Sequence, residues 1–352
     1  MSLVLAAWAL AALGFTLFAW VRLQPLAPEA PFDCPVLLLR PVESPTQREL
    51  ENLSAPLPVG VRQVVLSPFA LPVKVAGEWL HSDPPTANRK AGHLVYALTT
   101  LSPEGAVVVV ADADVQVDEP LLRALVGPVL QGAALVTAEP RAVGAPSLGA
   151  AALRGLLNHT HQNFRAVDAV SVGAKPVCGK AMALGPAALR ELSGLTGCIG
   201  EDLELSVRLH AAGEWVALAS APAHMPQAAV SLRASLLRTT RWMQVLKAHR
   251  PALGPFVPAL FACTPVLVTL ALLSQAPLLQ GVVAALVAVR TGFALALTKK
   301  PSGAWEWALG EVLLLGAYVA ALGKRSVQWR GRRFDVLPGG AIRTLVRSEA
   351  ST

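Results

Sequence analysis

The chain has 352 residues, of which 53% are hydrophobic and only 15% are charged, and this composition excludes an ordinary soluble enzyme. The net charge is +7, but the Arg and Lys residues lie beside apolar stretches rather than among aromatic ones, so we expect a membrane surface and no nucleic acid as partner. The four cysteines are far apart and form no CxxC pair, which argues against a zinc site or a disulfide framework.

An apolar stretch at residues 3–21 is about long enough to cross a bilayer as a helix, with Trp8 and Trp20 toward its ends. We interpret residues 1–24 as a transmembrane anchor. A cleaved signal peptide is the alternative, but no basic segment precedes the stretch and no small-residue cleavage site is obvious. Arg22 follows the apolar stretch, which predicts that the next domain, residues 33–230, is cytoplasmic.

Apolar runs and amphipathic segments alternate in the first half of this domain. The runs at 35–40, 62–66, 107–110 and 134–137 predict strands, and the segments at 44–53, 88–101 and 121–130 predict helices. Ser44 or Thr46 is available to cap the first of these helices. Alternating strands and helices predict an α/β fold with a doubly wound, Rossmann-like sheet.

Asp112 and Asp114 follow four consecutive valines, a pattern typical of a strand that is buried on both faces. Ligands of open α/β sheets bind outside the carboxyl ends of the strands, where both carboxylates would emerge. Hard oxygen ligands suit Mg²⁺ or Mn²⁺, and the phosphates of a nucleotide diphosphate complete the metal shell. The alternative interpretation is a loop with ordinary acidic turn residues.

A second acid pair, Glu201 and Asp202, stands at the start of a predicted helix over residues 203–212. Acids at this position are favourable with the helix dipole and need no further role. A general base for a sugar hydroxyl would have the same pattern.

Residues 231–252 predict a basic amphipathic helix in the membrane interface. Arg238 and Arg241 lie three residues apart on one helix face, so their guanidinium groups are able to bind a diphosphate, and Trp242 follows. The alternative is an interfacial helix whose basic side chains only reach the lipid headgroups.

Three further apolar stretches, at 256–273, 277–297 and 304–322, lie within a membrane region over residues 253–323. The basic tail, residues 324–352, should be cytoplasmic by the positive-inside rule, yet three crossings would place it outside. We therefore expect one stretch to be re-entrant or interfacial. Arg290, Glu306 and Glu311 are the expected buried polar residues within the membrane region.

In this order the motifs resemble the membrane-bound GT-A glycosyltransferases of the family-2 type. The closest resemblance is to the ceramide glucosyltransferase family, family 21, with its bacterial relatives that include hopanoid-associated glycosyltransferases. The motifs that carry it are LLLRPV at 37–42, Asn88-Arg-Lys90, Asp112-Ala-Asp114, Glu201-Asp202, Arg238-Thr-Thr-Arg241-Trp242 and WRGRRF at 329–334.

The resemblance implies an inverting transfer of a hexose, glucose first, from a nucleotide sugar to a lipid hydroxyl. Asp202 would be the general base, and Asp112 and Asp114 would hold Mg²⁺ or Mn²⁺. The donor, UDP-glucose first, would be bound by Asn88, Lys90, Asp112, Arg238, Arg241 and Trp242, with Trp242 as a wall between sugar and acceptor. His161 would lie near the acceptor, and Gly179 would allow its close approach.

One departure concerns the acid that relatives carry just after the second strand, where it is thought to contact uracil. Residues 66–72 contain no acid, and Asp83 is the nearest substitute, so the donor base stays open. A multi-pass protein of the bacterial inner membrane with ceramide as acceptor is the first expectation, and a hopanoid or other lipid is the second. A polysaccharide synthase and a non-catalytic membrane scaffold are the alternatives.

Overall fold

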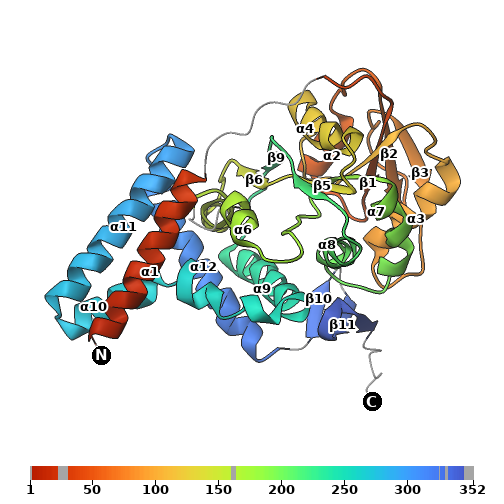
Figure 1. The fold of residues 1–352 in the computed structure, drawn as a ribbon. Helices are drawn as coiled ribbons and strands as arrows, with labels where there is room; N and C mark the ends of the chain where they lie inside the picture. The colour runs from red at the N-terminus through yellow and green to blue at the C-terminus, as the bar shows by residue number, and fades with distance from the viewer. Residues whose placement is uncertain (1, 23–30, 160–163, 325, 330–331, 345–352) are drawn as a thin grey trace, which may run out of the picture.

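The computed structural model describes residues 2–22, 31–159, 164–324, 326–329 and 332–344. An α/β domain carries the largest sheet, a group of apolar helices lies at the opposite end, and a small C-terminal sheet lies beside helix α9 (Figure 1). His161 and Arg330 lie outside the described residues.

The largest sheet has seven strands in the order β3-β2-β1-β4-β7-β5-β8. Their bounds are β1 Val36–Pro41, β2 Val61–Ser67, β3 Glu78–His81, β4 Val107–Ala111, β5 Leu135–Thr137, β7 Ala181–Leu184 and β8 Val216–Leu218. Strands β1 to β4 run parallel, whereas β7 is antiparallel to β4 and β5. The predicted α/β fold is therefore confirmed. The parallel strands bring the segments after β1, β2, β3 and β4 to one edge of the sheet.

Helices cover both faces of this sheet, which is why β1 and β4 are buried at every position. They are α2 Gln47–Ser54, α3 Arg89–Leu101, α4 Glu119–Leu130, α7 Pro186–Glu191 and α8 Glu201–Ala211. Helices α5 Leu148–Arg154 and α6 Phe164–Val170 pack toward the group of apolar helices instead. Helix α4 packs on one face and α3 on the other. Thr46 caps α2 in a capping box and Asn88 caps α3, so side chains satisfy the first free N–H groups of both helices.

Several elements have no counterpart in the sequence prediction. Strand β3 lies in a segment for which the sequence predicted no strand or helix, and β6 Pro140–Val143 pairs with β9 Ala223–Pro226 in a separate two-stranded sheet. These strands have only four residues each, too few for a clear alternation of polar and apolar side chains. Helix α5 continues as the π-helix η1, Gly155–His159.

Helices α1 Ser2–Val21, α11 Pro277–Thr298 and α12 Gly303–Leu322 are each long and apolar enough to cross a membrane. A fourth stretch consists of two pieces bent by 49°: residues 251–261, with the π-helix η4 Val257–Phe261, and α10 Thr264–Ser274. Helices α1, α10 and α11 pack against one another away from the seven-stranded sheet, and α9 Leu232–His249 packs along α12 (Figure 1).

The expected buried polar residues of the membrane region are confirmed. Arg290 and Glu311 are 1% and 0% exposed, and Arg290 Nη1 lies 2.6 Å from Glu311 Oε1. Glu306 is also buried and pairs with Arg154 and, at 2.8 Å, with His159 Nε2. Each buried charge thus has a partner, as the low polarity of the interior requires.

Part of the expected basic tail is folded. Strands β10 Ser326–Trp329, β11 Arg332–Val336 and β12 Ile342–Thr344 form an antiparallel sheet in which Val327 and Phe334 are buried. Its last strand joins the loop before α8, because Ile199 N donates to Gly340 O at 2.8 Å and Ile342 N donates to Gly197 O at 2.9 Å. The C-terminal sheet therefore contacts the α/β domain.

Candidate active site

A buried arginine braces the loop after β4 that carries the first acid pair. Arg40, in β1, is 0% exposed, and its Nη2 donates to the carbonyl oxygens of Asp112 at 2.9 Å, Ala113 at 3.2 Å and Val115 at 2.7 Å. Burial lowers the pKa of Arg40 to about 10, which still leaves the guanidinium charged at neutral pH. The loop is thus held by three charge-assisted hydrogen bonds from the adjacent strand.

Two lysines neutralise the acid pair. Lys180 Nζ lies 3.0 Å from Asp112 Oδ2 and 2.7 Å from Asp114 Oδ2, and Lys90 Nζ lies 2.9 Å from Asp112 Oδ1 and 3.4 Å from Glu201 Oε1. Burial disfavours the charged form of Asp112, but the two ammonium groups outweigh it and hold the pKa of this carboxyl well below its usual range. We call these five residues together with Asp202 the acid–lysine cluster.

Gly179 joins the second acid pair to the first. Its N–H donates to Asp202 Oδ2 at 2.6 Å, and its carbonyl oxygen accepts from Lys90 Nζ at 2.6 Å. A Cβ at Gly179 would lie 3.1 Å from both Asp202 Oδ2 and Lys90 Nζ, closer than side chains normally pack. Asn88 completes the link, because its Nδ2 donates to Glu201 Oε2 at 2.9 Å.

The environment of Asp202 suits a general base. Burial, followed by the negative charge of Glu201, raises the pKa of Asp202 to about 6, although Lys90 and the N–H groups of Gly179 and Leu203 oppose the shift. A base whose pKa lies near the working pH is both unprotonated and able to accept a proton. Asp202, at the N-terminus of α8, has a pKa in the range that a general base needs near neutral pH.

The acid pair after β4 fits a divalent cation, subject to one rearrangement. Asp114 Oδ1 is buried and has no hydrogen-bond partner among the described residues, so a cation would satisfy it. Carboxylate oxygens are the ligands that Mg²⁺ and Mn²⁺ prefer, and one or two suffice when phosphates add the rest. Lys180 lies between the two carboxylates, however, and would have to move for a metal ion to bridge them.

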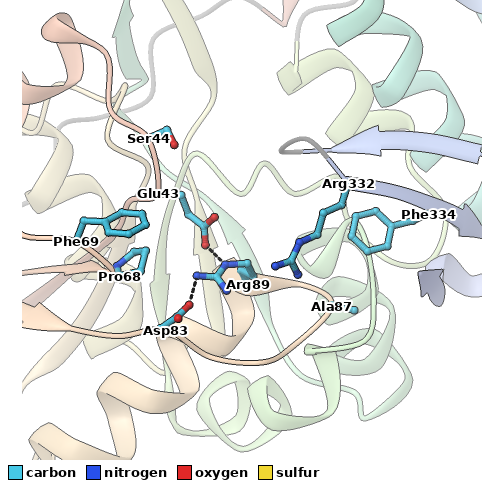
Figure 2. A pocket seen from close by; sticks show the side chains of 9 residues that line it. All are labelled: Glu43, Ser44, Pro68, Phe69, Asp83, Ala87, Arg89, Arg332 and Phe334. Atoms are coloured by element: carbon cyan, nitrogen blue, oxygen red, sulfur yellow. Dashed lines mark hydrogen bonds and ion pairs between the residues drawn. The ribbon is translucent and has the colours of Figure 1, made fainter. Parts of the chain in front are cut away.

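A cavity of about 270 Å³ opens at the same edge of the sheet, where β1, β2 and β3 end (Figure 2). Its lining comes from four parts of the chain: Glu43 and Ser44 after β1, Pro68 and Phe69 after β2, Asp83, Ala87 and Arg89 around the start of α3, and Arg332 and Phe334 of β11. Arg89 lines this cavity, and the next residue, Lys90, contacts Asp112. The first turn of α3 therefore connects the cavity to the acid–lysine cluster.

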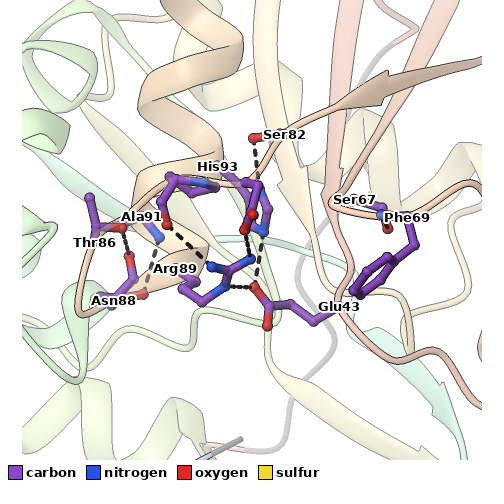
Figure 3. Close-up of polar contacts among 11 residues, drawn as sticks. Glu43, Ser67, Phe69, Ser82, Thr86, Asn88, Arg89, Ala91 and His93 are labelled. Carbon is purple, nitrogen blue, oxygen red and sulfur yellow. Dashed lines mark hydrogen bonds and ion pairs between the residues drawn. The ribbon is translucent and has the colours of Figure 1, made fainter. Parts of the chain in front are cut away.

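Arg89 is held in the cavity wall by acids from two sides. Its guanidinium pairs with Glu43 and, at 2.6 Å, with Asp83 Oδ1. Glu43 also contacts His93 Nε2 at 3.2 Å, and His93 Nδ1 lies 2.8 Å from Ser82 Oγ (Figure 3). The network fixes the side chain of Arg89 and leaves Asp83, which is 59% exposed, accessible from the cavity.

The structure thus places Asp83 in the wall of the same cavity as Phe69, which stands in the acid-free segment after β2 (Figure 2). From the sequence, Asp83 was the nearest substitute for the missing acid. A short strand, β3, and the pairing with Arg89 carry it to the cavity.

The arginine–tryptophan motif lies on α9, apart from the contacts of the acid–lysine cluster. Arg238 is exposed and Arg241 is half-buried. Trp242 packs against the apolar cluster that α5, η1 and α12 share with α9. The last turns of α9 approach the second acid pair instead, since Val245 and His249 lie against Gly200. The role of the motif in donor binding stays a prediction.

Three positions near the acids were missed or only partly read from the sequence. Lys180 follows Gly179 in a loop, and nothing in its neighbourhood signals an acid partner 66 residues away. Arg332 lies in the WRGRRF motif at 329–334, which carries the resemblance but predicted no role for this arginine. Arg40 did offer a signal, because a charged residue that ends an apolar run of a buried strand needs internal partners.

Comparisons with known proteins show the family to which the chain belongs. No curated protein matches it. A solved structure of the mannosyltransferase PcManGT from Pyrobaculum calidifontis, in complex with GDP-Man and Mn²⁺, is similar with a TM-score of 0.46 and 17% identity, over 91% of this chain and 99% of that one. Residues 76–342 match glycosyl transferase family 21, as the sequence motifs predicted. Since this match spans more than half of its length, the chain belongs to glycosyl transferase family 21.

Proposed function

We propose that this glycosyltransferase moves a hexose, glucose first, from a UDP-sugar to the hydroxyl of a membrane lipid, with inversion at the anomeric carbon. The observation that carries the proposal is the position of Asp202. A carboxylate with a raised pKa lies in one cluster with Lys90 and the acid pair, beside a cavity at the carboxyl edge of the sheet.

The cavity at the ends of β1 to β3 supports nucleotide binding. Its volume of about 270 Å³ and its mixture of aromatic and charged walls suit a nucleoside, with Phe69 against the base and Asp83 accepting a hydrogen bond from it. Lys90, one residue beyond Arg89, is then available to the diphosphate. Asp112 and Asp114 would hold a divalent ion that stabilises the charge on the leaving diphosphate.

Asp202 would remove the proton from the acceptor hydroxyl while that oxygen attacks the anomeric carbon. The N–H groups of Gly179 and Leu203 hold both carboxylate oxygens in place, at 2.6 and 3.0 Å. Arg238 and Arg241 would offset the charge of the departing diphosphate, and Trp242 would separate sugar from acceptor.

The apolar helices support a lipid acceptor, a ceramide-like lipid first and a hopanoid or other lipid second. A second cavity, of about 190 Å³, lies between the α/β domain and the loop that joins α11 to α12. Arg141 and His224 line it from the α/β domain, and Lys300 and Ser302 line it from the loop. A headgroup bound there would reach the protein while its chains stay in the bilayer.

Incubation of membranes that contain the protein with radiolabelled UDP-glucose, UDP-galactose or UDP-glucuronate, followed by lipid extraction, tests the proposal. We expect label in the lipid fraction with UDP-glucose and Mg²⁺ or Mn²⁺, and none with the Asp202→Asn variant. That variant should still bind UDP, because the described hydrogen bonds of Asp202 are with Gly179 and Leu203, neither of which lines the cavity. The absence of label from all lipid fractions with every donor would refute a lipid glycosyltransferase.

A further inference from the structure

The C-terminal sheet completes the wall of the donor cavity. Arg332 and Phe334 of β11 lie opposite Arg89 and Asp83 (Figure 2), although more than 240 residues of sequence separate the two groups. Phe334 is 2% exposed and anchors the strand, whereas Arg332 is exposed. Side chains two residues apart share a face of a strand, so β11 presents both to the cavity.

Contacts with the loop before Glu201 and with α9 fix the position of β11. The loop before Glu201 pairs with the turn between β11 and β12 through Ile199 and Gly340, and α9 holds β10 through Gln244 Nε2, which donates to Ser326 O at 3.0 Å. A Cβ at Gly340 would collide with His249 of α9, so the contact is tight. The sheet is therefore a fixed part of the site rather than a loose tail.

The two arginines that line the cavity, Arg89 and Arg332, differ in whether carboxylates already occupy their guanidinium groups. The guanidinium of Arg89 is engaged by Glu43 and Asp83. No described carboxylate lies within ion-pairing distance of Arg332, which leaves its planar set of donors available to an anion. A guanidinium binds phosphate oxygens in a bidentate way and with geometric selectivity.

We propose that Arg332 binds the diphosphate of a nucleoside diphosphate in this cavity, so that the C-terminal strand β11 is part of the donor site. The inference rests on the proposed function, because it takes the cavity to be the donor site. It adds a residue that binds phosphate, Arg332, and this residue lies outside the acid pairs and outside the arginine–tryptophan motif of α9.

Arg333 provides a matched control. It is the next residue of β11 and carries the same charge, but it is not part of the cavity wall, and its Nε donates to Ser326 Oγ at 3.1 Å. Calorimetric titration of the full-length protein in detergent with UDP and with uridine compares wild type, Arg332→Met, Arg332→Lys and Arg333→Met. Thermal unfolding of each variant checks that it is folded.

We expect Arg332→Met to weaken UDP binding about tenfold, the loss typical of one charge-assisted contact, and to leave uridine binding within about twofold of wild type. The UDP affinity of Arg332→Lys should lie between those of wild type and Arg332→Met, and Arg333→Met should bind UDP like wild type. The inference would be overturned if Arg332→Met and Arg333→Met lost UDP affinity equally, or if Arg332→Met kept the UDP affinity of wild type. It would also be overturned if Arg332→Met lost as much affinity for uridine as for UDP. A wild-type protein that binds neither UDP nor uridine would instead overturn the donor proposal itself.

Discussion

At the scale of single residues, the candidate site is an arrangement of unlike charges at close range. Asp112 accepts hydrogen bonds from two ammonium groups, whereas Asp202 is buried beside the negative charge of Glu201, with Lys90 as the main positive charge that offsets both effects on its pKa. The same cluster therefore lowers the pKa of one aspartate and raises that of another. The difference suits Asp112 to the binding of a cation and Asp202 to the acceptance of a proton, the roles that we propose for them.

The pH dependence of turnover follows from Asp202. The base must be unprotonated, and its pKa is about 6, so kcat/KM should rise with pH through about 6 and stay level above. Glu201→Gln should move this acidic limb to lower pH, because the variant removes a negative charge that raises the pKa of Asp202. A rate that is independent of pH between 5 and 8 would contradict the assignment, and initial rates measured in buffers of constant ionic strength decide it.

Lys180 should compete with the metal ion. Replacement of Lys180 by Met removes the ammonium group from between Asp112 and Asp114, so the donor-free protein should bind Mn²⁺ at least about tenfold more tightly. Electron paramagnetic resonance of free Mn²⁺ measures the affinity without reference to activity. Lys175→Met is the control, since Lys175 pairs with Asp168 and should leave Mn²⁺ affinity unchanged. An unaltered affinity in Lys180→Met would show that Lys180 does not occupy the metal position.

At the scale of elements, a buried ion pair holds the apolar helices together. Arg290 of α11 pairs with Glu311 of α12, and it also donates to Thr16 of α1 at 3.2 Å and to Leu260 O of η4 at 2.8 Å. One guanidinium therefore contacts three other segments that are distant in sequence. Arg290 thereby also binds the backbone close to the break between η4 and α10, since Leu260 O accepts one of its hydrogen bonds there.

Loss of one partner of this pair should destabilise the helices more than loss of both. Arg290→Met leaves the Glu311 carboxylate buried and uncompensated, which costs about 3–5 kcal/mol in such settings, whereas Arg290→Met combined with Glu311→Leu removes both charges. Thermal inactivation in detergent should therefore occur at a lower temperature for the single variant than for the double one. The opposite order would show that the pair itself, rather than charge compensation, sets stability.

At the scale of the whole molecule, the contacts of α12 bear on how the chain is arranged in the membrane. Its first turn carries Glu306, which pairs with Arg154 of α5, and its last turn accepts a hydrogen bond at Leu322 O from Lys247 of α9 at 3.2 Å. Arg250, at the end of α9, is in turn bound to the carbonyl oxygen of Ala174 in the α/β domain. Both ends of α12 thus lie next to the α/β domain or to α9 (Figure 1).

We therefore predict that α12 lies along the membrane surface despite its apolar sequence, and that the bent stretch and α11 form the pair that crosses and returns. Reporter fusions after Gln275 and after Thr352 should then lie on opposite sides of the membrane, with the second on the side of the α/β domain. The arrangement resolves the conflict over the basic tail, because two crossings return the chain to its starting side. Both reporters on one side would contradict it.

The sequence alone determined the features that arise from neighbouring residues. The valines of β4 and the acids behind them, the capped helices α2 and α3, and the apolar helices all depend on local hydrophobic patterns, which fix strands and helices with little help from the rest of the chain. Asp112, Asp114 and Asp202 were singled out as candidates by their positions in the sequence, and the order of the motifs predicted the family that the match over residues 76–342 confirms.

Only the tertiary structure decided which distant residues share the site. Lys180 lies at the acid pair because β7 runs antiparallel beside β4. Asp83 lines the same cavity as Phe69 because the four-residue strand β3 ends there. Arg332 joins the wall of the cavity at the ends of β1 to β3 because backbone hydrogen bonds attach the C-terminal sheet to the loop before Glu201. Such contacts depend on loop closure and pairing across long separations, and a local pattern carries no information about either.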